Sequence, residues 1–152
     1  ADYKKLKKQT PALKLIIVPH EVDEATIHQI EKNILHTDTA FFYARYTGRQ
    51  NFERHDILIV DTIGILSQLY QYGLAAYVGG GFNDGIHSIL EVLAHGVPVA
   101  FGPHHYKFVE ALETKQLEIG RVVHYEAELV SFFSEMISND AKRKNISGQI
   151  NV

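Results

Sequence analysis

The feature that most constrains this chain is a run of three glycines, Gly79 to Gly81, set between an apolar segment and a helical pattern. Residues 74–78 are short, apolar and typical of a buried strand. Beyond the glycines, apolar residues recur at helical spacing, and Gly96 follows where a helix end favours a left-handed residue. Residues 97–101 form a second buried run, so the stretch predicts a strand, a glycine turn, a helix and a parallel strand. The expected apolar stripe of this helix consists of Ile86, Ile89, Leu90, Leu93 and Ala94.

Polar residues on the predicted helix indicate a binding function. His87 and Ser88 lie four and three residues before Glu91, so the three side chains share a face away from the apolar stripe. A glycine loop and a helix N-terminus at the C-terminal edge of a parallel sheet favour an anion such as a phosphate. A carboxylate one turn into the helix can accept hydrogen bonds from a ribose diol. The alternative is a simple tight turn with a solvated Glu91, because a glycine-rich turn alone is a weak motif.

The composition is that of a soluble globular domain and argues against several other classes. The chain has 152 residues with a net charge of −3, which gives no support to nucleic-acid binding. It has no cysteine, so disulfides, zinc–thiolate sites and thiol nucleophiles are excluded. No apolar stretch reaches about 18 residues, so we expect no membrane span. Short basic clusters at residues 4–8 and 142–144 are either solvated ends or contacts for an anionic membrane surface. The only methionine is Met136, so we expect a fragment of a longer protein.

Apolar runs alternate with helical patterns along the rest of the chain. Further strands are predicted at residues 13–18, 40–46, 56–61 and 121–124. Helices are predicted at residues 1–10, 21–35, 62–72, 106–116 and 127–138, followed by a polar tail from Asn139. In the third of these helices we expect Thr62 as the N-cap and an apolar stripe of Ile63, Leu66, Leu69 and Tyr70. Six strands alternating with helices predict an α/β fold with a Rossmann-like, doubly wound parallel sheet.

Ligands of such sheets bind at the C-terminal ends of the strands, so the residues just beyond the strands are the candidates. His20 either binds an anion or belongs to a polar turn, and the amides at residues 62–64 either bind an anion or only open a helix. Adjacent side chains point apart, so His104 and His105 cannot easily chelate one metal, and no ligand spacing indicates a metal site. Neither a P-loop nor a G-x-G-x-x-G after the first strand is present, which argues against a standard dinucleotide site.

Four pieces of the chain match one known family in order and spacing. They are PHE at residues 19–21, DTIGILSQLY at 61–70, YVGGGFNDGIHSILE at 77–91 and AHGVPVAFGPHHYKF at 94–108. Together they resemble the C-terminal half of 3-deoxy-D-manno-octulosonic acid (Kdo) transferases, inverting glycosyltransferases of two-domain GT-B fold. The resemblance covers most of the chain. It implies that residues 1–152 are a single C-terminal nucleotide-sugar-binding domain, one half of a GT-B fold, without the N-terminal domain.

The resemblance also implies a site for the donor CMP-Kdo, with no cofactor and no metal. The glycine loop and the following helix start would face the phosphate, and Glu91 would take the ribose hydroxyls. His20 stands where the family places a donor-binding basic residue. The implied donor-binding residues are His20, Thr62, Ile63, Gly64, Gly79, Gly80, Gly81, His87, Ser88 and Glu91.

In the full-length protein, the resemblance implies transfer of Kdo to a lipid A precursor in lipopolysaccharide biosynthesis, at the cytoplasmic face of the bacterial inner membrane. The family's catalytic base, acceptor surface and membrane-associating segment lie in the N-terminal domain. We therefore expect no catalytic residue in this fragment. We expect the fragment to be soluble, to bind nucleotide weakly and to catalyse nothing.

The chain departs from the family pattern at Ile65, Ile86, Ser88 and Lys107. Many members carry Glu in place of Ile65 and Asn in place of Ser88 and Lys107, so the detailed donor contacts stay open.

Two other functions also stay open. One is a GT-B glycosyltransferase or sugar epimerase that uses a UDP-sugar. The other is a nucleotide-binding module without catalysis.

Overall fold

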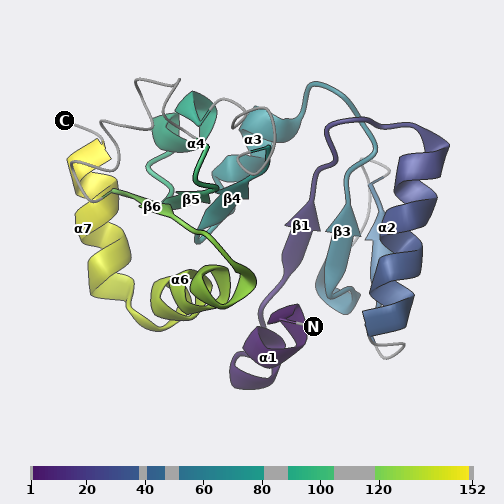
Figure 1. Cartoon of the computed structure of the whole chain (residues 1–152), viewed down its shortest axis with the longest axis horizontal. Helices are drawn as coiled ribbons and strands as arrows, with labels where there is room; N and C mark the ends of the chain where they lie inside the picture. The colour runs from purple at the N-terminus through teal and green to yellow at the C-terminus, as the bar shows by residue number, and fades with distance from the viewer. Residues whose placement is uncertain (1, 38–40, 47–51, 81–88, 105–118, 151–152) are drawn as a thin grey trace. The chain divides into compact units, whose positions relative to one another are not determined.

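The structure is a computed structural model that describes residues 2–37, 41–46, 52–80, 89–104 and 119–150 (Figure 1). The chain divides into two compact units, Ala1–Leu66 and Ser67–Val152. Each unit contains one three-stranded parallel sheet. The units are described one at a time.

The first unit is a parallel sheet packed against a long helix. It contains α1 (Asp2–Gln9), β1 (Leu15–Ile17), α2 (Glu24–Thr37), β2 (Tyr43–Arg45), a 3-10 turn (Phe52–Arg54) and β3 (Ile57–Ile59). The strand order is β1-β3-β2, which places β3, whose three residues are all buried, in the centre. Its core joins Ile27 and Ile34 of α2 to Ile57 and Ile59 of β3, and all four side chains are buried.

Helix α2 begins three residues later than the sequence predicted. Asp23 accepts a hydrogen bond from the backbone N–H of Thr26 at 3.0 Å and another from the Thr26 hydroxyl at 2.6 Å. This is an N-cap, which satisfies an N–H group that has no partner inside the helix. The cap fixes the start of the helix at Glu24, so the prediction of a start at residue 21 is wrong.

The second unit is a parallel sheet with helices on both faces (Figure 1). It contains β4 (Ala76–Val78), α4 (Leu90–Ala94), β5 (Val99–Phe101), β6 (Gly120–Val122), α6 (Glu126–Ser138) and α7 (Asp140–Ile150). Helix α3 (Leu66–Tyr70) begins at the last residue of the first unit and continues into the second. The strand order is β4-β5-β6.

Strand β5 shows why this sheet needs two helical layers. Val99 and Phe101 are buried in a core with Ile89 and Val92 of the α4 region. Ala100, which points the other way, is buried in a second core with Phe132 and Met136 of α6 and Ile146 of α7. All three β5 side chains are 0% exposed. A parallel strand buried on both faces reads as a continuous apolar run, which is what the sequence has here.

Gly96 ends α4 as predicted. Its φ is +64°, and its N–H donates to the carbonyl of Leu93 at 2.8 Å. The N–H of Val97 donates to the carbonyl of Val92 at 3.3 Å, which completes a Schellman motif. The apolar side of α4 differs from the prediction, because Val92 is buried while Leu90 is 56% exposed and Ala94 is exposed.

Two further boundaries correct the sequence prediction. Helix α3 begins at Leu66, so Thr62 cannot be its N-cap, and Ile63 is 82% exposed rather than part of an apolar stripe. The region after Asn139 is a helix, α7, and not a plain tail. The helix predicted at residues 106–116 lies outside the described residues.

The predicted α/β class is confirmed. The described residues contain six strands, all paired in parallel, in two sheets of three, with helices between β1 and β2, between β3 and β4, and between β4 and β5. The short N-terminal helix is also confirmed, as α1.

Candidate functional site

In the first unit, His20 and Thr62 occupy equivalent places beyond neighbouring strands. Ile17 of β1 is paired with Ile59 of β3, and the N–H of Val60 donates to the carbonyl of Ile17 at 2.9 Å. His20 and Thr62 each lie three residues beyond this pair, at the C-terminal edge of the sheet. Both are exposed. The sequence therefore placed these two residues at the same edge correctly.

The residues after β3 form a turn instead of the first turn of a helix. Gly64 has a φ of +89°, and a Cβ added there would meet nothing within 4 Å. Glycine is favoured here because of the left-handed backbone and not because of crowding. Thr62, Ile63 and Gly64 are all exposed, so the turn presents this segment to solvent at the sheet edge.

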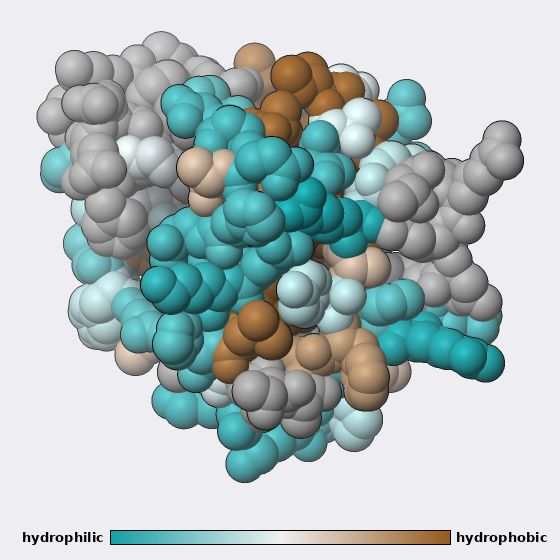
Figure 2. All heavy atoms as spheres, turned by 90° about the vertical axis from the view of Figure 1, so that its right-hand side faces the viewer, coloured by the Kyte–Doolittle hydropathy of each residue, from teal (hydrophilic) through white to brown (hydrophobic). Residues whose placement is uncertain are grey.

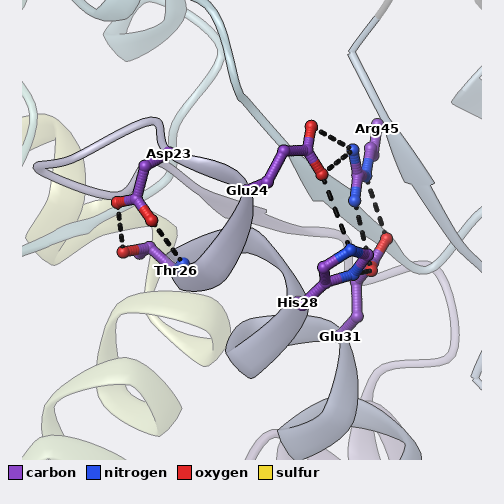
Figure 3. Close-up of polar contacts among 6 residues, drawn as sticks. All are labelled: Asp23, Glu24, Thr26, His28, Glu31 and Arg45. Atoms are coloured by element: carbon purple, nitrogen blue, oxygen red, sulfur yellow. Dashed lines mark hydrogen bonds and ion pairs between the residues drawn. The ribbon is translucent and has the colours of Figure 1, made fainter.

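An ionic cluster that the sequence analysis missed lies at the end of β2 (Figure 3). Arg45, the last residue of β2, donates from Nε to Glu31 at 3.0 Å and from Nη1 to both oxygens of Glu24 at 3.1 Å. His28 Nδ1 lies 3.0 Å from Glu31. The hydrogen bond from Arg45 holds the pKa of Glu31 below its ordinary value. The sequence could have indicated the helical part of this cluster, because the spacing of Glu24, His28 and Glu31 places them on one face of a helix.

A surface hollow of about 460 Å³ lies along the same helix, lined by His28, Glu31, Lys32, Leu35, His36 and Tyr43. It reaches Leu35 in the last turn of α2 and Tyr43 at the start of β2. The hollow thus runs from the carboxylate of Glu31, which bonds Arg45, to the last turn of α2. The face of the molecule that carries α2 is mostly hydrophilic (Figure 2).

In the second unit, the glycines follow β4 at the C-terminal edge of its sheet. Val78 is paired with Phe101 of β5, so Gly79 and Gly80 come directly after the last pair of these two strands. Gly80 has a φ of +89°, a conformation that other residues rarely adopt. The predicted glycine turn therefore begins where the sequence placed it.

Glu91 lies on α4 and is exposed. It makes no hydrogen bond or ion pair within the part of the chain that the structure describes. Tyr70 of α3 is half-buried, and both burial and the charge of Glu91 raise the pKa of its hydroxyl. The prediction that Glu91 lies away from the apolar side of its helix agrees with its exposure.

Gly81, His87 and Ser88 of the predicted site lie outside the described residues. Among the described residues, no group of three or more His, Cys, Asp or Glu side chains is placed to hold a metal ion. No described helix is long and apolar enough to cross a membrane.

The two described edges share a chemistry suited to anions and hydroxyl groups. The first unit offers an imidazole, a hydroxyl and exposed backbone at the ends of β1 and β3. The second offers a glycine turn after β4 and, on the helix that follows, a carboxylate. Backbone N–H groups and an imidazole can bind phosphate oxygens, and a carboxylate can accept hydrogen bonds from sugar hydroxyls.

Comparison with known proteins identifies the relatives of this chain. No protein-family model matches it. It is 37% identical over 138 residues to the 3-deoxy-D-manno-octulosonic acid transferase of Aquifex aeolicus, a match that covers 90% of this chain. The chain is homologous to the Kdo transferases. This confirms the resemblance that its four motifs indicated.

The Kdo transferase match spans only part of the relative, because the chain covers 37% of the Aquifex aeolicus protein. A second relative is the bifunctional glycosyltransferase/methyltransferase of Fusobacterium nucleatum, which is 31% identical over 154 residues. That match covers 98% of this chain and 22% of the relative.

The fold of a solved structure matches as well. The crystal structure of the C-terminal CMP-Kdo binding domain of WaaA from Acinetobacter baumannii superposes with a TM-score of 0.83 at 18% identity. The match covers 99% of this chain and 78% of that one. At this identity the likeness establishes the shared fold, which agrees with the predicted half of a GT-B enzyme.

Proposed function

We propose that the chain is the donor-binding part of a Kdo transferase and that it binds the nucleotide of CMP-Kdo. The observation that carries the proposal is the 37% identity to a Kdo transferase across 90% of the chain. The chemistry of the two sheet edges is consistent with it. The proposal treats residues 1–152 as one C-terminal domain of a longer protein.

In this proposal each predicted residue has a role in donor binding. Gly79, Gly80 and Gly81 bring backbone N–H groups to the phosphate, and Glu91 accepts hydrogen bonds from the ribose hydroxyls. His20 supplies a basic group to the donor. Thr62, Ile63 and Gly64 border the nucleotide, and His87 and Ser88 line the same site.

The reaction of the full-length protein would be a direct displacement. A carboxylate base in the other domain removes the proton of an acceptor hydroxyl, and the resulting oxygen attacks the anomeric carbon of Kdo. The bond between that carbon and the phosphate oxygen of CMP breaks, and CMP leaves with the electron pair. This domain stabilises the charge of the departing phosphate. The acceptor is a lipid A precursor, reached at the cytoplasmic face of the inner membrane.

A titration with CMP, followed by backbone NMR of the 152-residue chain, tests the proposal. We expect shifts at Gly79, Gly80 and Glu91 with CMP and smaller shifts with UMP. The Glu91→Ala variant should weaken the CMP response. Asp140→Ala is the matched control, because it removes an exposed carboxylate from α7, which packs on the opposite face of the sheet.

This titration, together with an assay of sugar transfer, separates the competing functions. A preference for UMP would favour a UDP-sugar enzyme over a Kdo transferase. Absence of binding by both the chain and the full-length protein would refute a donor site at this edge. Sugar transfer by the isolated chain would contradict the expectation that the catalytic base lies in another domain. Nucleotide binding by a full-length protein that transfers no sugar would indicate a non-catalytic module.

A further inference from the structure

Tyr70 lies beside the proposed ribose-binding carboxylate, on a neighbouring helix. It is the last residue of α3, and its ring packs against the core that contains Val78 and Ile89. The ring centroid lies 6.4 Å from that of His95, with the two planes tilted by 39°. These contacts leave the phenol ring little freedom to move relative to α4.

Glu91 lies on the side of α4 that carries His95. The two residues are four apart, so they are separated by one helical turn on the same side of the helix. Because the ring of Tyr70 lies against His95, the carboxylate of Glu91 is one turn away from that contact. The charge of Glu91 also contributes, after burial, to the raised pKa of the Tyr70 hydroxyl. The ring contact with His95 places Tyr70 on the side of α4 that carries Glu91, and the effect of the Glu91 charge on the Tyr70 hydroxyl agrees with that placement.

The two groups have complementary hydrogen-bonding chemistry. A phenol hydroxyl can donate one hydrogen bond, whereas an ionised carboxylate only accepts and has room for about four bonds. Among the described residues, no hydrogen bond or ion pair restrains Glu91. An exposed carboxylate that binds a diol gains from being held in one rotamer, since less side-chain entropy is lost on binding.

We propose that Tyr70 is a positioning residue for Glu91. With nucleotide bound, the Tyr70 hydroxyl donates a hydrogen bond to the Glu91 carboxylate and orients it to accept the ribose hydroxyls. The packing of the Tyr70 ring on His95 and on the core holds the hydroxyl in place. The proposal rests on the donor site described above and adds the residue that sets its preference for ribose over deoxyribose.

The test compares the affinities of the full-length protein for CMP and 2′-deoxy-CMP. We expect the wild type to bind CMP at least about tenfold more tightly, because a hydrogen bond to a charged group is lost without the 2′-hydroxyl. Tyr70→Phe should reduce this ratio by about fivefold. Tyr77→Phe is the matched control, since Tyr77 is also half-buried but packs against the other core of the unit. It should leave the ratio unchanged.

The outcomes separate this inference from the proposed function. If Glu91→Ala abolishes the ratio and Tyr70→Phe does not change it, the role of Tyr70 is wrong and the donor site stands. If Glu91→Ala also leaves the ratio unchanged, the ribose site itself is wrong. A measurement on the wild type avoids any loss of folding in the variants. With tyrosines labelled with ¹³C at Cζ, CMP should shift the signal of Tyr70 and leave that of Tyr77 in place, and an unmoved Tyr70 signal would overturn the inference.

Discussion

Arg45 of β2 donates two hydrogen bonds to Glu31 of α2, from Nε at 3.0 Å and from Nη2 at 3.3 Å. The same guanidinium also donates to Glu24, which lies one turn before His28 on α2. A single cation therefore joins α2 to the end of the edge strand β2. The side chain of Glu31 is 17% exposed. The pair is therefore a structural tie between α2 and the sheet, and it leaves Arg45 engaged by protein carboxylates.

This tie predicts a pH dependence of stability. The folded-state pKa of Glu31 is lowered from 4.5, first of all by its hydrogen bond from Arg45. A lowered folded pKa stabilises the protein above pH 4.5, and the contribution is lost as the pH falls through the folded value. We expect Glu31→Gln to reduce stability by at most about 1 kcal/mol at pH 7 and to flatten the acid side of the stability curve.

The measurement is urea unfolding between pH 3 and pH 7. Glu21→Gln serves as the control, because Glu21 is exposed and makes no hydrogen bond or ion pair within the described residues. An equal loss of acid sensitivity in both variants would contradict the assignment to Glu31.

Two neighbouring residues of the α4 region should differ widely in their effect on stability. Ile89 is 0% exposed in the core beside Val78, whereas Leu90 is 56% exposed. Ile89→Ala should cost about 3 kcal/mol of unfolding free energy through lost burial and the cavity left behind. Leu90→Ala should change it by less than about 0.5 kcal/mol. Equal losses in denaturant titrations of the two variants would mean that the helix presents a different side to the sheet.

Glycine to alanine changes should have opposite signs at two positions. Gly96 has a φ of +64°, where a Cβ is strained, so Gly96→Ala should destabilise by about 1 kcal/mol. Gly148 lies within α7, and a Cβ added there meets nothing within 4 Å. Gly148→Ala should stabilise by about 0.5–1 kcal/mol, because alanine loses less backbone entropy in a helix. Thermal unfolding measures both changes. A Gly96→Ala variant that is no less stable than the wild type would argue against the Schellman ending of α4, and a destabilised Gly148→Ala variant would argue against the helical position of Gly148.

A tyrosine connects α1 to the sheet of the first unit. The Tyr3 hydroxyl lies 3.0 Å from the carbonyl of Leu13 and 2.9 Å from that of Asp56, and burial raises its pKa. Tyr3→Phe should cost about 1 kcal/mol, since these acceptors lose their donor. Tyr72→Phe, at a side chain that is 73% exposed, should be neutral in the same urea titration. No difference between the two variants would show that the hydroxyl contributes nothing.

The sequence predicted those features that depend on local rules. The strands were found because apolar runs mark them, and the end of α4 was found because Gly96 is the residue that tolerates a left-handed backbone there. The stripe of α4 was misplaced at Leu90 because nearly every residue from Ile89 to Ala94 is apolar, which leaves the periodicity ambiguous. Val92 is buried because of the way α4 packs on the sheet, and the spacing of the apolar residues alone does not predict that packing.

The missed features depend on contacts between distant segments. Helix α7 has a polar sequence in which only Ile146 is buried among its described side chains, so it has almost no amphipathic signal. It is held by Arg143, which donates to the carbonyl of Met136, and by Ser147, which donates to the carbonyl of Gly96. The start of α3 was misjudged because Thr62 looked like a cap, whereas the backbone at Gly64 requires a turn first. The functional residues themselves remain a prediction from the family motifs.

The burial of β5 on both faces has a consequence for the dynamics of the second unit. Its amides are covered by two helical layers and bonded to strands on either side, so they should exchange with solvent only when the whole unit opens. Gly79 and Gly80 follow β4, which is paired on one side only in the described chain. Their amides should therefore exchange through small local openings. A ligand bound at the C-terminal edge of this sheet can therefore slow hydrogen exchange in the glycine turn. The amides of β5, which exchange most slowly, change their rates only when the stability of the whole unit changes.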